Sequence, residues 1–131
     1  MGGPARMTAL VDTSVLIDVL RGRHEALAAL TQAREEGPLH ASEITRTEVL
    51  AGMRPGEEPA TRAALDALSW HPVDRDVAER GAELARRWRP SHSGVDIADF
   101  LIAATCELVD ARLITCNTKH FPMFTGLRPP Y

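Results

Sequence analysis

Three acidic residues, Asp12, Glu48 and Asp99, stand at points in the sequence where their side chains can act together. Carboxylate oxygens are hard ligands, which suit Mg²⁺ or Mn²⁺ and not zinc. Packed together without a cation, they would face like charges in a poor dielectric, and their pKa values would rise. A divalent metal ion resolves that conflict, deprotonates a water and stabilises charge that builds on a phosphoryl group. We therefore expect metal-assisted hydrolysis that needs no nucleophilic Ser or Cys.

The first acid, Asp12, lies between a predicted strand and a predicted helix. Residues 9–11 are a short apolar run typical of a buried strand, and apolar side chains then recur at helical spacing. In a parallel α/β sheet, ligands bind outside the carboxyl ends of the strands. The alternative is structural, because Asp, Thr and Ser are also common helix caps.

The mid-chain acid, Glu48, falls within a helix predicted for residues 42–52. That helix must turn an apolar face inward, so the carboxylate can project into a cleft. Alternatively, Thr45 and Glu48 have the spacing of a capping box, in which both side chains serve the helix terminus. The sequence leaves both interpretations open.

The third acid, Asp99, lies in a stretch that is otherwise almost entirely apolar, residues 97–106. This pattern predicts a helix buried on most of its circumference, where a carboxylate is costly unless a cation neutralises it. Asp96 lies three residues earlier on the same face and is an accessory ligand candidate. Both acids can equally cap the helix and complement its dipole.

Strand-like and helix-like segments alternate along the chain, and the helical connections are long enough for parallel pairing. This order predicts a three-layer α/β/α domain with a central, mostly parallel sheet. Pro72 restricts its strand to an edge, whereas the apolar run at 111–116 suits a central strand. Thr115 and Asn117 would then emerge beside Asp12. The predicted strands are residues 9–11, 39–41, 70–73 and 111–116.

Length and composition favour one compact domain. The chain has 131 residues, of which 44% are hydrophobic, so we expect a flexible leader at residues 1–6 followed by a single domain at 7–131. The leader has no apolar segment of the kind found in signal peptides or membrane spans, which points to the cytoplasm. Cys106 and Cys116 sit in apolar surroundings and are expected to be buried free thiols.

The net charge of −3 argues weakly against a surface built for nonspecific binding of nucleic acid. Its cations are nevertheless distinctive, because Lys119 is the single lysine and all the others are arginines, whose planar fork suits phosphate. Candidates for phosphate contacts lie next to the acid-bearing segments: Arg21, Arg23, Arg46 and Arg54.

Four motifs in this order and spacing resemble a known family. They are LVDTSVLIDVLRG, ITRTEVLAG, GVDIADFLIAAT and LITCNTKHF, which occupy residues 10–22, 44–52, 94–105 and 113–121. The chain resembles PIN-domain endoribonucleases, and most closely the VapC-type toxins of bacterial toxin–antitoxin pairs. The resemblance covers residues 8–127 and implies a parallel sheet flanked by helices.

The resemblance also implies roles for individual residues. The family's acids fall on Asp12, Glu48 and Asp99, which would be the catalytic and metal-binding residues. Many PIN proteins have a fourth acid where this chain has Asn117, and Asp96, at a variable position of the motif, would supply the missing charge. Supporting positions of the family fall on Thr13, Ser14, Thr115 and Asn117.

A protein of this family is expected to be a cytoplasmic, Mg²⁺- or Mn²⁺-dependent ribonuclease. The resemblance implies a homodimer that inhibits translation by cutting structured RNA, such as tRNA or rRNA, with single-stranded loops as targets. A VapB-type antitoxin would silence it by placing an arginine or lysine among the acids.

Two other functions remain open. A phosphotransfer enzyme with Asp12 as nucleophile is disfavoured, because Ser14 stands where a second acid would be expected. A catalytically silent PIN-like scaffold that binds RNA or protein is the other alternative.

Overall fold

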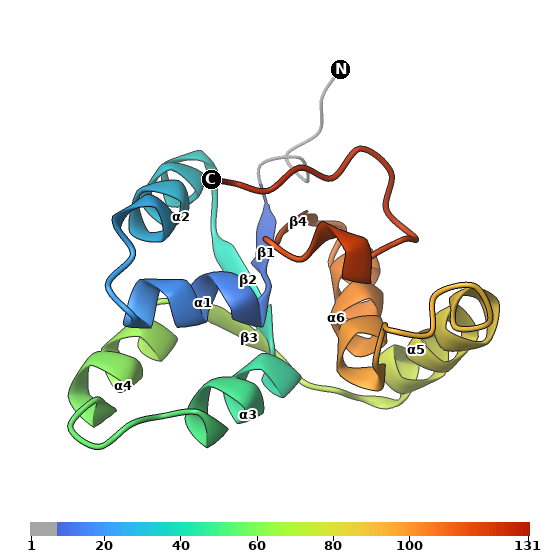
Figure 1. Cartoon of the computed structure of the whole chain (residues 1–131), viewed down its shortest axis with the longest axis horizontal. Helices are drawn as coiled ribbons and strands as arrows, with labels where there is room; N and C mark the ends of the chain where they lie inside the picture. Colours follow the sequence, from blue (N-terminus) through green and yellow to red (C-terminus); the bar gives the residue numbers. More distant parts are fainter. Residues whose placement is uncertain (1–7) are drawn as a thin grey trace.

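The computed structural model describes residues 8–131, so the leader predicted for residues 1–6 lies outside the described part. Its four strands are β1 (Ala9–Val11), β2 (Leu39–Ser42), β3 (Ser69–His71) and β4 (Arg112–Ile114). They form one sheet in the order β3-β2-β1-β4, and every pairing is parallel. Helices cover both faces of this sheet (Figure 1), which confirms the predicted three-layer α/β/α fold.

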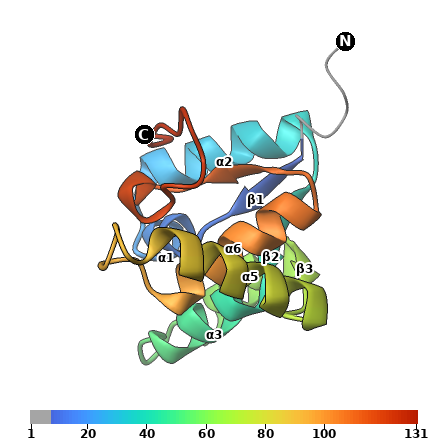
Figure 2. The ribbon, with the colours of Figure 1, turned by 90° about the vertical axis from the view of Figure 1, so that its right-hand side faces the viewer.

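The helices divide between the two faces. Of the six α-helices, the first four pack on one face around Val11 and Ile114, and the fifth and sixth pack on the other around Leu10 and Leu113. Figure 2 shows the second group in front of the sheet. No helix within residues 8–131 combines the length and the apolar character needed to span a bilayer. The helices are α1 (Thr13–Leu20), α2 (His24–Glu36), α3 (Glu43–Ala51), α4 (Glu58–Asp66), α5 (Arg75–Trp88), α6 (Ile97–Leu108) and the short 3₁₀ helix η2 (Thr118–His120).

The prediction that the last strand is central is wrong, because among residues 8–131 β4 pairs only with β1 and forms an edge. Its apolar sequence has another cause. Leu113 packs against the core under α5 and α6, whereas Ile114 packs against the core under α1 and α2. Helices on both faces therefore require apolar residues at successive positions, whether or not both edges of the strand are paired.

A close contact between α5 and α6 fixes α6, the helix that carries two of the predicted acids. A Cβ atom at Gly81 would lie 2.9 Å from Leu101 Cδ2, so the missing side chain lets the two helices approach. Phe100 and Ile102 are fully buried beside this contact. The start of α6 is therefore held rigidly with respect to the sheet.

Both cysteines are free thiols. Cys106 is buried, and its thiol donates to the Ala111 carbonyl oxygen at 2.9 Å. Burial raises the pKa of Cys106 to about 12, so this thiol stays protonated and structural. Cys116 is only half-buried, less than the sequence suggested.

Two histidines on neighbouring strands predict a pH dependence of stability. His40 Nδ1 of β2 lies 2.7 Å from His71 Nε2 of β3. Burial, followed by the charge of His71, lowers the pKa of His40 below its ordinary value of 6.5. The unfolded chain therefore binds more protons than the folded protein as the pH falls below about 6.5, and the free energy of unfolding falls with it.

In an Asp99→Asn background, which removes the opposite contribution of that carboxyl, we expect urea denaturation to give a lower unfolding free energy at pH 5.5 than at pH 7.5. His40→Gln should remove part of this loss, whereas His24→Gln, on an exposed residue, should retain it. An equal loss in His40→Gln and the parent protein would contradict the assignment.

Candidate active site

Asp12 stands at the carboxyl end of β1, at the N-cap position of α1, but its side chain makes no capping hydrogen bond. The capping interpretation of its carboxylate is therefore wrong. Two hydroxyls donate instead to the same oxygen, Asp12 Oδ2: Ser14 Oγ at 2.8 Å and Thr115 Oγ1 at 2.7 Å. The residue is only 3% exposed. Its other oxygen, Oδ1, accepts no hydrogen bond from residues 8–131.

The register of the sheet explains this arrangement. Val11 lies opposite Ile114, so the residues that follow β1 and β4 emerge side by side. The Asp12 N–H donates to the Ile114 carbonyl at 2.9 Å, and the Asn117 N–H donates to Thr115 Oγ1 at 3.0 Å. Asn117 is exposed, and its side-chain amide makes no hydrogen bond within the described residues.

Glu48 is held by a contact that local spacing does not reveal. Thr13 Oγ1 donates to Glu48 Oε1 at 2.6 Å, and it is also hydrogen-bonded with Thr45 Oγ1 at 3.0 Å. The capping box predicted for Thr45 and Glu48 is wrong, because α3 begins earlier. Its N-cap is Ser42, whose side chain accepts from the Ile44 N–H at 3.2 Å.

Asp96 and Asp99 form a capping box at the start of α6. Asp96 Oδ1 accepts from the Ala98 N–H at 3.0 Å, and Asp99 Oδ2 accepts from the Asp96 N–H at 3.3 Å. Asp96 is exposed, and its carboxylate forms the cap of the helix. Asp99 is half-buried. One of its oxygens accepts the capping hydrogen bond and contacts His120, and the other has no partner among the described residues.

His120, which falls in the fourth motif but was given no role there, lies beside this acid. Its Nδ1 is 3.3 Å from Asp99 Oδ2, and η2 places it there directly after β4. Burial raises the pKa of Asp99 from its ordinary 3.8 to about 6, although the Asp96 N–H and His120 act in the opposite direction. The charges of Asp96 and Asp12 add to the increase.

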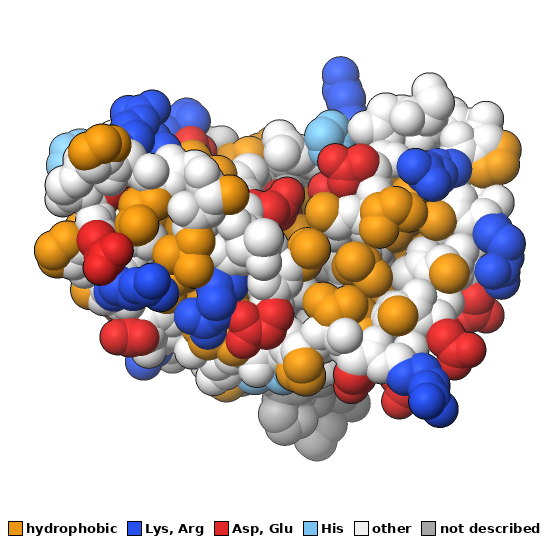
Figure 3. Space-filling model, turned by 90° about the horizontal axis from the view of Figure 1, so that it is seen from below, with side chains coloured by type: hydrophobic (Ala, Val, Ile, Leu, Met, Phe, Trp, Pro, Cys, Tyr) orange, Lys and Arg blue, Asp and Glu red, His pale blue; other side chains and the backbone are white. Residues whose placement is uncertain are grey.

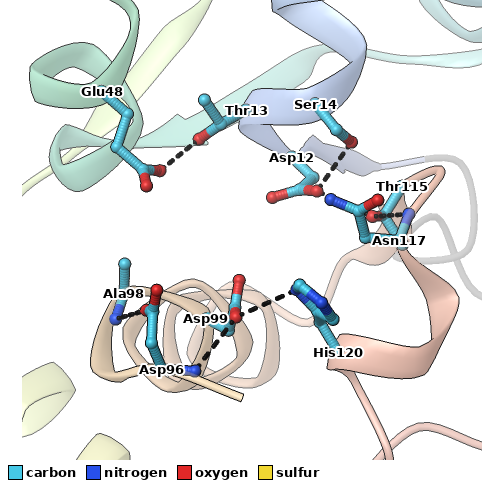
Figure 4. A network of polar contacts seen from close by, with 10 residues as sticks. All are labelled: Asp12, Thr13, Ser14, Glu48, Asp96, Ala98, Asp99, Thr115, Asn117 and His120. Carbon is cyan, nitrogen blue, oxygen red and sulfur yellow. Dashed lines mark hydrogen bonds and ion pairs between the residues drawn. The ribbon is translucent and has the colours of Figure 1, made fainter. Parts of the chain in front are cut away.

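Figure 4 shows the three predicted acids facing one space from three elements: Asp12 after β1, Glu48 on α3 and Asp99 on α6. Each uses one oxygen on a protein partner and leaves the second unbonded within residues 8–131. On the surface, acidic side chains lie along a hollow between the two halves of the molecule (Figure 3).

Free oxygens of this kind suit a hard divalent cation. The negative charge of Asp12, after that of Asp96, helps to raise the pKa of Asp99, whereas that of Glu48 does not. As the side chains stand, no group of three or more His, Cys, Asp or Glu residues in the described chain is placed to hold one ion.

Three of the four arginines predicted to contact phosphate are paired with acids. Arg21 binds Glu57 at 2.9 Å, Arg23 lies 3.5 Å from Asp18, and Arg46 binds Glu43 at 2.6 Å. These pairs are partly exposed, so a phosphate can still compete for the arginine. The side chain of Arg54 makes no hydrogen bond or ion pair within residues 8–131.

Thr115→Val tests whether the hydroxyl that holds Asp12 matters. We expect about a tenfold loss of kcat/KM in the metal-dependent RNA cleavage that the sequence resemblance implies, because loss of an outer partner of a metal ligand costs about 10–100-fold. Thr115→Ser retains the hydroxyl and should recover most of the rate. Thr105→Val removes a buried hydroxyl that donates to the Leu101 carbonyl of its own helix, and it should leave the rate unchanged. Equal rates in both valine variants would contradict the assignment.

A parallel α/β domain with acidic side chains converging at the carboxyl ends of its strands is the arrangement of the PIN fold. Residues 9–123 match the PIN domain family, and the chain belongs to it. This confirms the resemblance noted in the sequence motifs.

The relatives are similar along almost their whole length. Ribonuclease VapC19 of Mycobacterium tuberculosis is 47% identical over 123 residues, which cover 93% of this chain and 98% of the relative. Ribonuclease VapC10 of the same organism is 40% identical over 122 residues, covering 93% and 92%. Among solved structures, a toxin–antitoxin complex from Klebsiella pneumoniae superposes with a TM-score of 0.76 at 35% identity, covering 94% of this chain and 98% of that one.

Proposed function

We propose that this protein is a Mg²⁺- or Mn²⁺-dependent endoribonuclease, the toxin of a VapBC-type toxin–antitoxin pair. The observation that carries the proposal is the set of three carboxylates that face one space, each with an unbonded oxygen. Relatives of 40–47% identity are named ribonucleases. The substrate would be a structured RNA, such as tRNA or rRNA, whose cleavage stops translation in the cytoplasm.

The chain's own residues account for ion binding and for orientation. When bound, the ion would supply an activated water and neutralise charge on the phosphoryl group. Asp12 and Asp99 would hold it, and Glu48 would complete the acidic wall. The hydroxyls of Ser14 and Thr115 orient Asp12, and Thr13 orients Glu48.

Two further residues have smaller parts in this proposal. Asp96 acts through its charge, because its carboxylate caps α6. The side-chain amide of Asn117 stands beside Asp12 (Figure 4) and is free to meet substrate. A neutral amide where many family members have an acid favours one ion over two.

A VapB-type antitoxin is the proposed partner, and the structural relative from Klebsiella pneumoniae is itself a toxin–antitoxin complex. A basic side chain of the antitoxin would bind the same carboxylate oxygens as the metal ion. It would therefore inhibit the enzyme by competition and would also relieve the repulsion among the acids.

Cleavage of labelled tRNA and rRNA tests the proposal. We expect discrete products with Mn²⁺ or Mg²⁺ and none after addition of a chelator. A protein that binds RNA but leaves it intact with either metal would be the silent scaffold, and the nuclease proposal would fail. Equal cleavage with and without chelator would refute the metal dependence.

We also propose a homodimer that is formed through α6. Ile97 and Leu108, eleven residues apart on the same side of this helix, are 48% and 56% exposed. Apolar side chains gather over α5 and α6 on the face seen in Figure 3. Exposed apolar patches of this kind mark interaction sites.

Leu108→Asp should convert the dimer to a monomer in light scattering. Leu27→Asp changes an equally exposed leucine on α2 and should leave the dimer intact. A parent protein that is monomeric at micromolar concentration would contradict the dimer, as would a dimer that survives Leu108→Asp.

A further inference from the structure

Two open cavities flank the loop that joins α5 to α6, residues 89–96, on the right of Figure 1. One, of 460 Å³, is lined by Ala85, Arg86, Arg89, Pro90 and Ser93. The other, of 450 Å³, has His92, Lys119 and Phe124 in its wall. The loop ends at Asp96, and Lys119 precedes His120, so both cavities adjoin the elements that carry the acidic site.

The cations of these cavities have no acidic partner. Arg86, Arg89 and Lys119 are exposed, and none forms an ion pair within the part of the chain that the structure describes. Arg21 and Arg46, by contrast, are each neutralised by a glutamate. Arg54 is also unpaired within residues 8–131, but Arg86, Arg89 and Lys119 line the two cavities around one loop.

The loop between the cavities is held in place. The N–H groups of Ser91 and His92 donate to the Trp88 carbonyl at 3.2 and 2.9 Å. The His92 ring stands edge-on to Trp88, with centroids 5.7 Å apart, and its Nδ1 is 2.8 Å from Ser91 Oγ. Val95, 4% exposed, anchors the far end of the loop in the core. Little ordering is therefore needed when a ligand binds.

We propose that Arg86, Arg89 and Lys119, here called the basic tract, bind successive phosphates of a single RNA strand on its way to the acidic site. The proposal rests on the proposed function, because RNA is the substrate assumed there. Unpaired guanidinium and ammonium groups bind phosphate by releasing counterions, and bases of a single strand stack on aromatic rings. Phe124, in the wall beside Lys119, offers such a ring.

The test measures RNA binding in the full-length Asp12→Asn protein, which needs no cleavage. The probe is a fluorescent single-stranded RNA of mixed sequence. Arg89→Gln with Lys119→Gln removes one cation from each cavity and should weaken binding about tenfold at low salt. The slope of log K against log salt should shrink by about 0.7 for each phosphate that the variant no longer neutralises.

The matched control is Arg62→Gln with Arg75→Gln, which removes two exposed arginines from α4 and from the other end of α5. It should keep the parental affinity and slope. The proposal is overturned if the Arg89→Gln, Lys119→Gln variant keeps the affinity and salt slope of this control. It is also overturned if oligoglutamate displaces the fluorescent RNA as well as an unlabelled RNA of equal charge does. Failure of the wild-type protein to cleave RNA is a separate result that refutes the nuclease and not the binding tract.

Discussion

Asp12→Asn is expected to reduce RNA cleavage by more than about 100-fold, because loss of outer partners of a metal ligand alone costs about 10–100-fold. The asparagine has nearly the same shape, and its carbonyl oxygen can still accept from Ser14 or Thr115. Asp12 is the most buried of the three acids, and the change removes its negative charge. Initial rates on a labelled RNA, measured with Mn²⁺, give the comparison.

Asp66→Asn is the matched control for this experiment. It makes the same chemical change on an exposed residue of α4 and should keep the parental rate. Circular dichroism should show that both variants are folded. Undiminished cleavage by folded Asp12→Asn would refute the active-site assignment, whatever the effect of other substitutions.

Much of the fold follows from the sequence because burial leaves a strong pattern. Residues 9–11 are apolar since helices cover both faces of β1, and the change to Asp12 marks the end of that strand. The same pattern does not report how many strands lie alongside. For this reason the apolar run of β4 predicts a central strand, although the strand is an edge.

The site could be predicted only in part, because its chemistry depends on contacts between distant residues. The spacing of Thr45 and Glu48 favours a capping box, but Thr13, 35 residues before Glu48, binds that carboxylate instead. His120 reaches Asp99 only through the turn after β4, and no periodicity marks it. Similarly, nothing in the sequence pairs Arg21 with Glu57, 36 residues away.

The capping box of α6 shows how stability and function share one side chain. One oxygen of Asp99 bonds the Asp96 N–H, which stabilises the helix start, while burial of the charge opposes folding. An asparagine could make the same hydrogen bond without the charge. The capping hydrogen bond alone therefore does not explain a carboxylate at this position.

Asp99→Asn is accordingly expected to stabilise the metal-free protein at pH 7.5. A pKa of about 6 against an ordinary value of 3.8 corresponds to roughly 3 kcal/mol, of which we expect about 1–2 kcal/mol after screening by solvent. Because the folded-state pKa is the higher one, the folded protein binds more protons between about pH 6 and pH 3.8. The penalty is therefore complete above pH 6 and disappears as the pH falls through this window.

Thermal unfolding in the presence of EDTA measures the effect. The variant should melt several degrees above the parent protein at pH 7.5 and at the same temperature as the parent near pH 4. Parent and variant both carry His40, so its opposite contribution cancels at each pH, and Asp66→Asn should match the parent at both pH values. Mn²⁺ should raise the melting temperature of the parent, because an ion that binds the folded protein relieves the repulsion between Asp12 and Asp99. Two results would show that Asp99 is a helix cap and not a metal ligand. One is an Asp99→Asn variant that is less stable than the parent at pH 7.5, and the other is a variant whose melting temperature rises with Mn²⁺ as much as that of the parent.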